Sequence, residues 1–264
     1  MIGRRIALGL VLLSALVFSA FAASSASAAV AGTTMFTCAK SPEQLPGFTD
    51  EHCTKAAKTD KEVKRKHVAV AQDKETIFHG TNEKTSADTT KAEPTILKTS
   101  FLGVEVEISC SKVFAHGNIT NRLNGAKEHY IHGTKVTILY TGCKYIKPGF
   151  CKVKGEKIEI TGVTATTEKE GDNVRFKPEA GETLVTFESE GFGCPAKAEI
   201  KGTFRAQVEG ATLSFTEAGT TADKSLTFAG NAMGISGKIT LSQADETQEA
   251  GKTGDPLTAT TIET

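Results

Sequence analysis

Short stretches in which apolar and polar residues alternate are the feature that most limits the folds open to this chain. Every second residue from Leu102 to Cys110 is apolar, and the residues between them include Glu105, Glu107 and Ser109. Successive side chains of an extended chain point to opposite faces, so this pattern predicts a half-buried β-strand. The segment 198–209 alternates in the same way over a longer run. One face of such a strand must meet water.

Further strand candidates recur at short spacing along the chain, with turn residues such as Pro148-Gly149 between them. No amphipathic helical pattern separates them, which argues against a parallel α/β sheet. The sequence therefore predicts an all-β fold, either an antiparallel β-sandwich or a flattened β-barrel, of roughly ten strands. Besides 102–110 and 198–209, the candidates are 77–78, 113–120, 130–140, 157–161, 174–176, 184–187, 213–215, 226–228 and 233–241.

The first 29 residues have the three-part layout of a secretory signal peptide. Arg4 and Arg5 precede an apolar run over 6–21, and the small residues of 22–29 offer cleavage sites. The apolar run is shorter than the roughly 20 residues that span a bilayer, and no second apolar run follows. We expect cleavage and export, with no stable membrane insertion after the signal is removed.

All six cysteines lie beyond the expected cleavage site, and an even number in an exported chain indicates disulfides. No two of them have the C-x2-C spacing that tetrahedral zinc sites use, so we expect no metal and no cofactor. The turn at 148–149 favours a bond between the cysteines that flank it. The expected pairs are Cys38 with Cys53, Cys143 with Cys151, and Cys110 with Cys194.

Four regions follow from these patterns. Residues 1–29 form the signal peptide, and residues 30–72 form a small cysteine-closed N-terminal segment with a basic linker. Residues 73–243 form the antiparallel β-domain. Residues 244–264 are polar and carry no hydrophobic pattern, so we expect a disordered tail there.

The chain has 31 basic and 31 acidic residues, and the signal peptide would remove only two arginines from this balance. A near-neutral protein has no global field that would steer it onto nucleic acid, so we expect no nucleic-acid partner. One local cluster around the turn at 148–149 combines lysines with aromatic side chains, which suits an anionic polymer, although lysines also protect exposed sheet edges. Its candidate ligand-binding residues are Lys144, Tyr145, Lys147, Lys152 and Lys154.

His129 and His132 are the candidates for acid and base chemistry. Residues three apart share a face on a helix, but these two lead into a strand, where they point to opposite faces. A secreted hydrolytic enzyme that uses this pair stays open as an alternative. A lipocalin-like carrier of a small apolar ligand is a further alternative, favoured if a barrel has an open apolar interior.

Several short segments are similar to segments in uncharacterised exported proteins of soil actinobacteria: Phe36-Thr37-Cys38, residues 47–54, residues 117–121 and Thr141-Gly142-Cys143. The resemblance covers most of the mature chain. No activity is attached to that group, so the resemblance assigns no role to any residue. We predict an exported, non-enzymatic binding or structural protein of the cell envelope or extracellular space, and the sequence leaves its ligand and oligomeric state open.

Overall fold

The structure is a computed structural model that describes residues 32–40, 44–50, 53, 55–82, 92–126, 128–168, 173–216, 225–243 and 257–262. The predicted signal peptide, residues 1–29, lies outside these ranges. Within them helix is limited to two short 3-10 turns, η1 (Asp60–Glu62) and η2 (Lys154–Glu156). The prediction of an all-β fold is confirmed.

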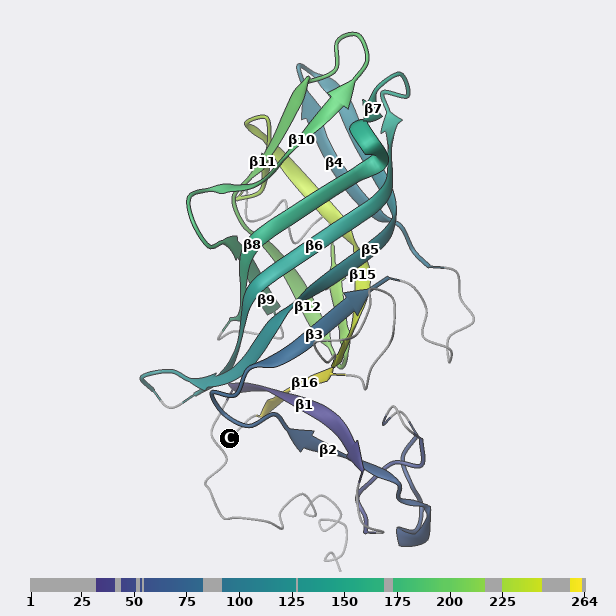
Figure 1. Cartoon of the computed structure of the whole chain (residues 1–264), viewed down its shortest axis with the longest axis vertical. Helices are drawn as coiled ribbons and strands as arrows, with labels where there is room; N and C mark the ends of the chain where they lie inside the picture. The colour runs from purple at the N-terminus through teal and green to yellow at the C-terminus, as the bar shows by residue number, and fades with distance from the viewer. Residues whose placement is uncertain are drawn as a thin grey trace, which may run out of the picture.

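The described residues form 16 strands that belong to one hydrogen-bonded sheet (Figure 1). The strands range from two residues in β7 to 20 residues in β5. The strands are β1 (Gly32–Lys40), β2 (Arg65–Ala69), β3 (Thr76–Thr81), β4 (Thr95–Phe101), β5 (Val104–Leu123), β6 (His129–Lys147), β7 (Lys152–Val153), β8 (Lys157–Thr167), β9 (Asn173–Pro178), β10 (Thr183–Glu190), β11 (Lys197–Lys201), β12 (Phe204–Glu209), β13 (Thr212–Phe215), β14 (Thr227–Phe228), β15 (Asn231–Gln243) and β16 (Leu257–Ile262).

Part of this sheet closes on itself. Strands β13, β12, β9, β8, β6, β5, β3 and β15 are hydrogen-bonded in that order, and β15 pairs with β13 through partners such as Leu213 and Ile239. Because the path returns to its first strand, the edges within this ring are paired. Of the two predicted architectures, the pairing therefore matches a flattened barrel.

The barrel is irregular because its long strands change partners along their length. On one edge β15 pairs first with β4, up to Ser236, and then with β3, from Thr240; on its other edge it pairs first with β14 and then with β13, from Gly237. Gly237 has a φ of +154°, and a Cβ at this position would lie 2.8 Å from Oγ1 of Thr95. Glycine at this position therefore avoids a clash with Thr95 where the strand changes partners. Strands β14, β11, β10 and β7 continue the sheet beyond β15 and build the upper part of the molecule in Figure 1.

Strand β5 is one strand of 20 residues, where the sequence predicted two separate strands. The apolar pattern changes phase between Cys110 and Val113, which resembles a turn in sequence. Strand β6 changes phase beside it at Gly142, whose φ is +61° and whose Cβ position would lie 2.2 Å from Oγ of Ser111. Both strands shift together at this close approach, so neither has to end.

One hydrophobic cluster fills the barrel and continues into its upper part. Every second residue of the long strands contributes to it, as the alternation predicted. Its largest fully buried side chains include Tyr140, Phe204 and Phe228. Stacked rings of Phe176 and Phe204, with centroids 4.7 Å apart, join the neighbouring strands β9 and β12.

The N-terminal segment packs against the lower end of the barrel through Asn121, a buried residue of β5 (Figure 1). Its Nδ2 donates to the carbonyl oxygens of Met35 at 3.1 Å and Val70 at 2.8 Å, and its Oδ1 accepts from the Met35 amide at 2.9 Å. Three hydrogen bonds from one side chain thus fasten β1 and the segment after β2 to the barrel.

The predicted disorder of residues 244–264 is wrong for Leu257–Ile262, which form β16. This strand pairs antiparallel with β1, and Leu257 is fully buried. Its Thr- and Ala-rich sequence has little hydrophobic pattern of its own. The strand is specified by its partner, more than 200 residues earlier in the chain, which a local pattern does not reveal.

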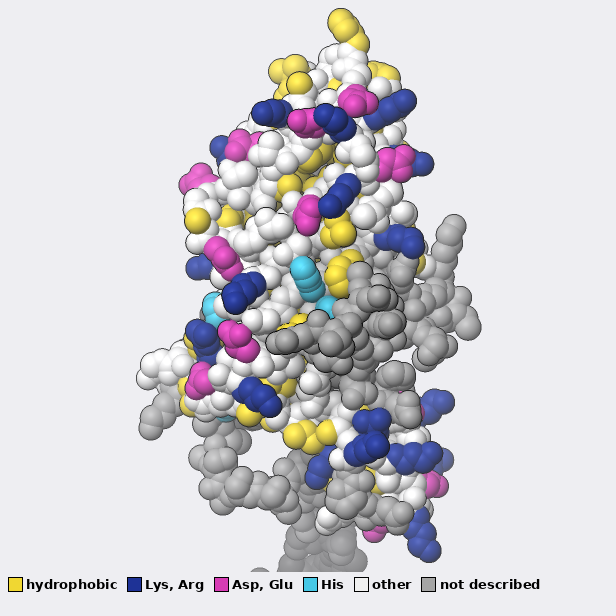
Figure 2. Space-filling model, in the orientation of Figure 1, with side chains coloured by type: hydrophobic (Ala, Val, Ile, Leu, Met, Phe, Trp, Pro, Cys, Tyr) yellow, Lys and Arg dark blue, Asp and Glu magenta, His cyan; other side chains and the backbone are white. Residues whose placement is uncertain are grey.

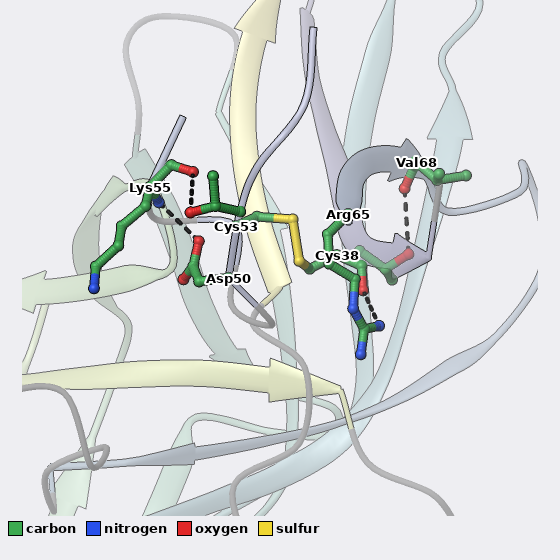
Figure 3. Close-up of a disulfide and its surroundings, with 8 residues drawn as sticks. Cys38, Asp50, Cys53, Lys55, Arg65 and Val68 are labelled. Atoms are coloured by element: carbon green, nitrogen blue, oxygen red, sulfur yellow. Dashed lines mark hydrogen bonds between the residues drawn. A yellow bond between two sulfur atoms is a disulfide. The ribbon is translucent and has the colours of Figure 1, made fainter. Parts of the chain in front are cut away.

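Cys38 and Cys53 form the disulfide that the sequence predicted (Figure 3). Around it, the Lys55 amide donates to Oδ1 of Asp50 at 2.8 Å, and Arg65 donates to the Cys38 carbonyl at 3.4 Å. The predicted basic linker is thus partly ordered, because Arg65–Ala69 forms β2 and pairs with β1.

The other two predicted disulfides are wrong. Cys110 bonds to Cys143, and Cys151 bonds to Cys194. The register of β5 and β6 places Cys110 directly opposite Cys143, which leaves neither available for its predicted partner. Cys151 lies just before β7, whose pairing with the end of β10 brings it to Cys194.

Candidate functional site

Large apolar side chains are exposed together at the upper end of the molecule, where three loops project (Figure 1). We call this set the apolar tip: Leu102 (84% exposed), Val104 (53%), Ile146 (51%), Phe150 (64%) and Phe192 (99%). Figure 2 shows hydrophobic side chains at this extreme, with charged side chains of both signs just below. A cluster of exposed apolar residues marks an interaction site more often than single ones do.

The first loop of the tip is the two-residue turn Leu102-Gly103 between β4 and β5. Both residues have positive φ, +51° for Leu102 and +79° for Gly103, as a type I′ hairpin turn requires. Asn or Gly normally occupies the first of these positions, because other side chains are strained there. Leu102 therefore combines an unfavourable backbone with an exposed apolar side chain.

The other two loops are tied to each other. In the loop after β6, the Cys151 amide donates to the Pro148 carbonyl at 3.2 Å. In the loop after β10, the Cys194 amide donates to the Gly191 carbonyl at 3.3 Å. The Cys151–Cys194 disulfide joins the two turns. Phe150 precedes Cys151, and Phe192 follows Gly191, so the disulfide holds together the two loops that carry these exposed rings.

Gly191 allows these two loops to approach closely. Its φ is +126°, and a Cβ at this position would lie 2.7 Å from the carbonyl oxygen of Phe150 and 2.8 Å from Sγ of Cys194. A larger residue would therefore push the loops apart. The spacing between the two exposed phenylalanines depends on this glycine.

Tyr145, a predicted ligand-binding residue, lies beneath the tip and not on its surface. Its side chain is buried, and its hydroxyl lies 2.7 Å from Oγ of Ser189 on β10. Burial raises the pKa of Tyr145, against a smaller opposite effect of the Ser189 hydrogen bond. Tyr145 thus joins β6 to β10 under the loops.

The four lysines predicted beside Tyr145 are exposed but interleaved with glutamates. Nζ of Lys147 lies 3.0 Å from Glu105, and this hydrogen bond raises the pKa of Lys147. Lys154 pairs with Glu188, and Nζ of Lys144 lies 3.8 Å from Glu156. Lys152 lies opposite Glu190 where β7 pairs with β10. We call the three ion pairs the charged collar. The net charge of these three pairs is zero, whereas the sequence suggested a basic patch.

The structure does not bring His129 and His132 together. Alternation along β6 directs them to opposite faces of the strand. His132 lies 3.2 Å from Oγ1 of Thr166, and burial lowers the pKa of His132, with Arg122 and Lys177 lowering it further. Among the described residues no group of three or more His, Cys, Asp or Glu side chains could hold a metal ion.

A histidine pair that the sequence analysis did not single out lies elsewhere. His79 on β3 is the direct partner of His116 on β5, and the ring of Phe114 contacts both. Burial lowers the pKa of His116, while Glu159 raises it to a smaller extent. His79 is also the direct partner of Ser242 on β15, and among the described residues the pair belongs to no group of three or more His, Cys, Asp or Glu side chains that could hold a metal ion.

The interior of the barrel contains a cavity of about 40 Å³ with apolar lining, including Met35, Phe78 and Phe176. Pockets for small organic ligands usually measure about 300–1,000 Å³. The cavity is therefore too small for the ligand of a lipocalin-like carrier. The bulky side chains of the core occupy the remaining volume.

None of the five tip residues, Leu102 and Phe192 included, was among the predicted site residues. A signal was present in the sequence: a leucine precedes glycine in a hairpin turn, and a phenylalanine lies between two glycines. Turns favour Gly, Asn and Asp, so a large apolar residue at such a position is unusual. The sequence did not show that these turns meet at one end of the fold.

No protein-family model matches the sequence, and comparisons with curated proteins and with solved structures find no match. The resemblance to exported actinobacterial proteins stays a prediction. In the part of the chain that the structure describes, no helix is long and apolar enough to cross a membrane.

Proposed function

We propose that the protein is a non-enzymatic binding protein of the cell envelope or extracellular space, and that it binds its partner through the apolar tip. The observation that carries this proposal is the exposure of five large apolar side chains on three neighbouring loops and the strand ends next to them. The three disulfides support the location, because such bonds are typical of extracellular proteins.

The tip is difficult to explain as a contribution to folding. Phe192 is 99% exposed and Leu102 is 84% exposed, so neither side chain adds to the core. Leu102 also occupies a left-handed backbone conformation, which costs about 1–2 kcal/mol for a residue other than glycine. A strained backbone conformation at a residue that exposes an apolar side chain favours a role in binding.

The two alternatives have less support. A hydrolase would need His129 or His132 beside a nucleophile or a second acid, and the two histidines lie on opposite faces of β6. A carrier would need an interior far larger than the observed cavity. The apolar tip, in contrast, can act as a contact surface with the side chains that it already exposes.

The test is recovery of the mature protein on isolated cell-envelope material, comparing wild type with Phe192→Ser and Leu102→Asn. We expect both variants to bind less, and the double variant least. Leu123→Ser is the matched control, because Leu123 is an exposed leucine at the opposite end of β5. Equal binding by wild type and the double variant would refute the role of the tip.

A further inference from the structure

We infer that the partner of the apolar tip is the interfacial layer of a phospholipid bilayer, which the tip enters reversibly while the barrel stays outside. This inference rests on the proposed function, since it names the partner of the same surface. The contact is peripheral, made by loops and not by a membrane-spanning element. Four features of the tip favour it.

The first feature is shape. Leu102, Phe150 and Phe192 are on projecting loops, and the 99% exposure of Phe192 shows that no neighbouring segment forms a wall beside it. Small ligands bind in concave sites that surround most of their surface. Protruding side chains suit a fluid layer, which adapts to them without a preformed recess.

The second feature is the size of the apolar surface. A large side chain presents on the order of 200 Å² when fully exposed, so the five residues with their exposed fractions offer roughly 700 Å². A stable protein–protein interface needs roughly 800 Å² from each partner. Three separate loops divide the apolar area of the tip, so it lacks the continuous surface that a symmetric dimer formed tip to tip would need. Insertion into an interface requires no matching surface of this size.

The third feature is the charged collar beneath the tip. Lys147 with Glu105, and Lys154 with Glu188, place both signs at the same level below the apolar side chains. A zwitterionic headgroup layer presents phosphate and ammonium groups together, and this arrangement complements them. Long lysine side chains can also extend from an apolar boundary towards water. Because the collar has no net charge, binding should not depend on anionic lipid.

The fourth feature is the rigidity of the support. The Cys151–Cys194 disulfide, the Tyr145–Ser189 contact and the close approach at Gly191 hold two of the loops in one arrangement. Loops that are fixed before binding lose less conformational entropy when they bind. Their exposed backbone groups also limit the depth of entry, since these groups need water or headgroups as partners.

The direct experiment uses the absence of tryptophan from this chain. In Phe192→Trp the tip carries the single tryptophan, which we expect to shift its emission to shorter wavelength with phosphatidylcholine vesicles and to be quenched by brominated phosphatidylcholine. Leu123→Trp is the matched reporter at the opposite end of β5 and should show neither effect. An unchanged Phe192→Trp spectrum, with no quenching, would overturn the inference.

Vesicle flotation gives the corresponding affinity. Replacing Phe192 with Ser should weaken partition into phosphatidylcholine vesicles at least about tenfold, the loss expected for one buried aromatic side chain. Leu102→Asn should also weaken it, although asparagine suits the turn and keeps the fold intact. Partition should change little between low and high salt. Binding that requires anionic lipid and disappears in salt would contradict the inference.

A third arm separates this inference from the proposed function. Wild type and the double variant Leu102→Asn/Phe192→Ser are applied to cell-envelope material from which lipid has been extracted. If wild type binds this material through the tip but does not bind vesicles, the partner is a protein or polymer and only the lipid inference fails. If wild type binds neither vesicles nor any envelope material, both proposals fail.

Discussion

Cys110 and Cys143 face each other directly across β5 and β6, with their Cα atoms 3.9 Å apart. They are direct partners in the antiparallel pairing, and this close spacing is typical of pairs that exchange no backbone hydrogen bonds. Both cysteines are buried within the continuous core. The disulfide therefore fixes the register of the two longest strands at the place where their apolar phase changes.

We expect disulfide mapping to join the peptide of Cys110 to that of Cys143. Trypsin cuts after Lys144, which lies between Cys143 and Cys151 in the sequence, so the competing arrangements give different linked peptides. Mass spectrometry of a non-reduced digest makes the measurement. A linked peptide that contains Cys143 and Cys151 would contradict the register of β5 and β6.

Replacing Asn121 with Ala should destabilise the fold by about 2–4 kcal/mol, because it leaves buried backbone groups of Met35 and Val70 without partners. Urea denaturation at neutral pH measures this loss. Asn118→Ala is the matched control on the same strand, since the Asn118 side chain donates to the exposed side chain of Glu75. The control should lose less than about 1 kcal/mol. Equal losses would argue against the Asn121 contact.

Leu102→Asn should leave the fold as stable as wild type, or stabilise it by about 1 kcal/mol, because asparagine tolerates a φ of +51° better than leucine does. The measurement is the midpoint of thermal unfolding. Gly103→Ala supplies the opposite comparison in the same turn, because it places a side chain at a φ of +79°. A stability loss for Leu102→Asn would mean that the leucine contributes to folding.

Stability should fall as the pH drops below about 6.5, partly because of His116. Burial lowers the pKa of this histidine in the folded state, so between the folded and unfolded pKa values the unfolded chain binds more protons. Its contribution is therefore complete above the unfolded pKa and is lost as the pH falls towards the folded pKa. Glu159 opposes the shift.

Thermal unfolding of wild type and His116→Gln at pH 7.5 and 5.5 measures this contribution. The variant should lose less stability over this range than wild type, because glutamine does not titrate. Carboxylates and the other histidines titrate in both proteins, so the difference isolates His116. Identical losses in the two proteins would contradict the effect of burial.

The alternating segments were sufficient to predict the strands, since a period of two reflects local backbone geometry. The prediction succeeded for the inward residues Val106, Ile108 and Cys110 and for those of 198–209, which are buried, but Leu102 and Val104 are exposed. The segment 198–209 is divided into β11 and β12. The prediction failed where strand formation depended on distant partners, as in Leu257–Ile262, which pairs with β1. The side-chain pattern indicates which face is buried but does not specify which strand is the neighbour.

Sequence by itself determined the all-β class, the alternation of the core and the local Cys38–Cys53 bond, because these follow from residues near each other in the chain. Only the tertiary structure decided the closure of β15 on β13, the partners of Cys110 and Cys151, and the meeting of Leu102, Phe150 and Phe192 at one end. The physical reason is that strand register and partner choice are settled by packing over long sequence separations. That same packing placed Tyr145 in the core and left the apolar tip exposed.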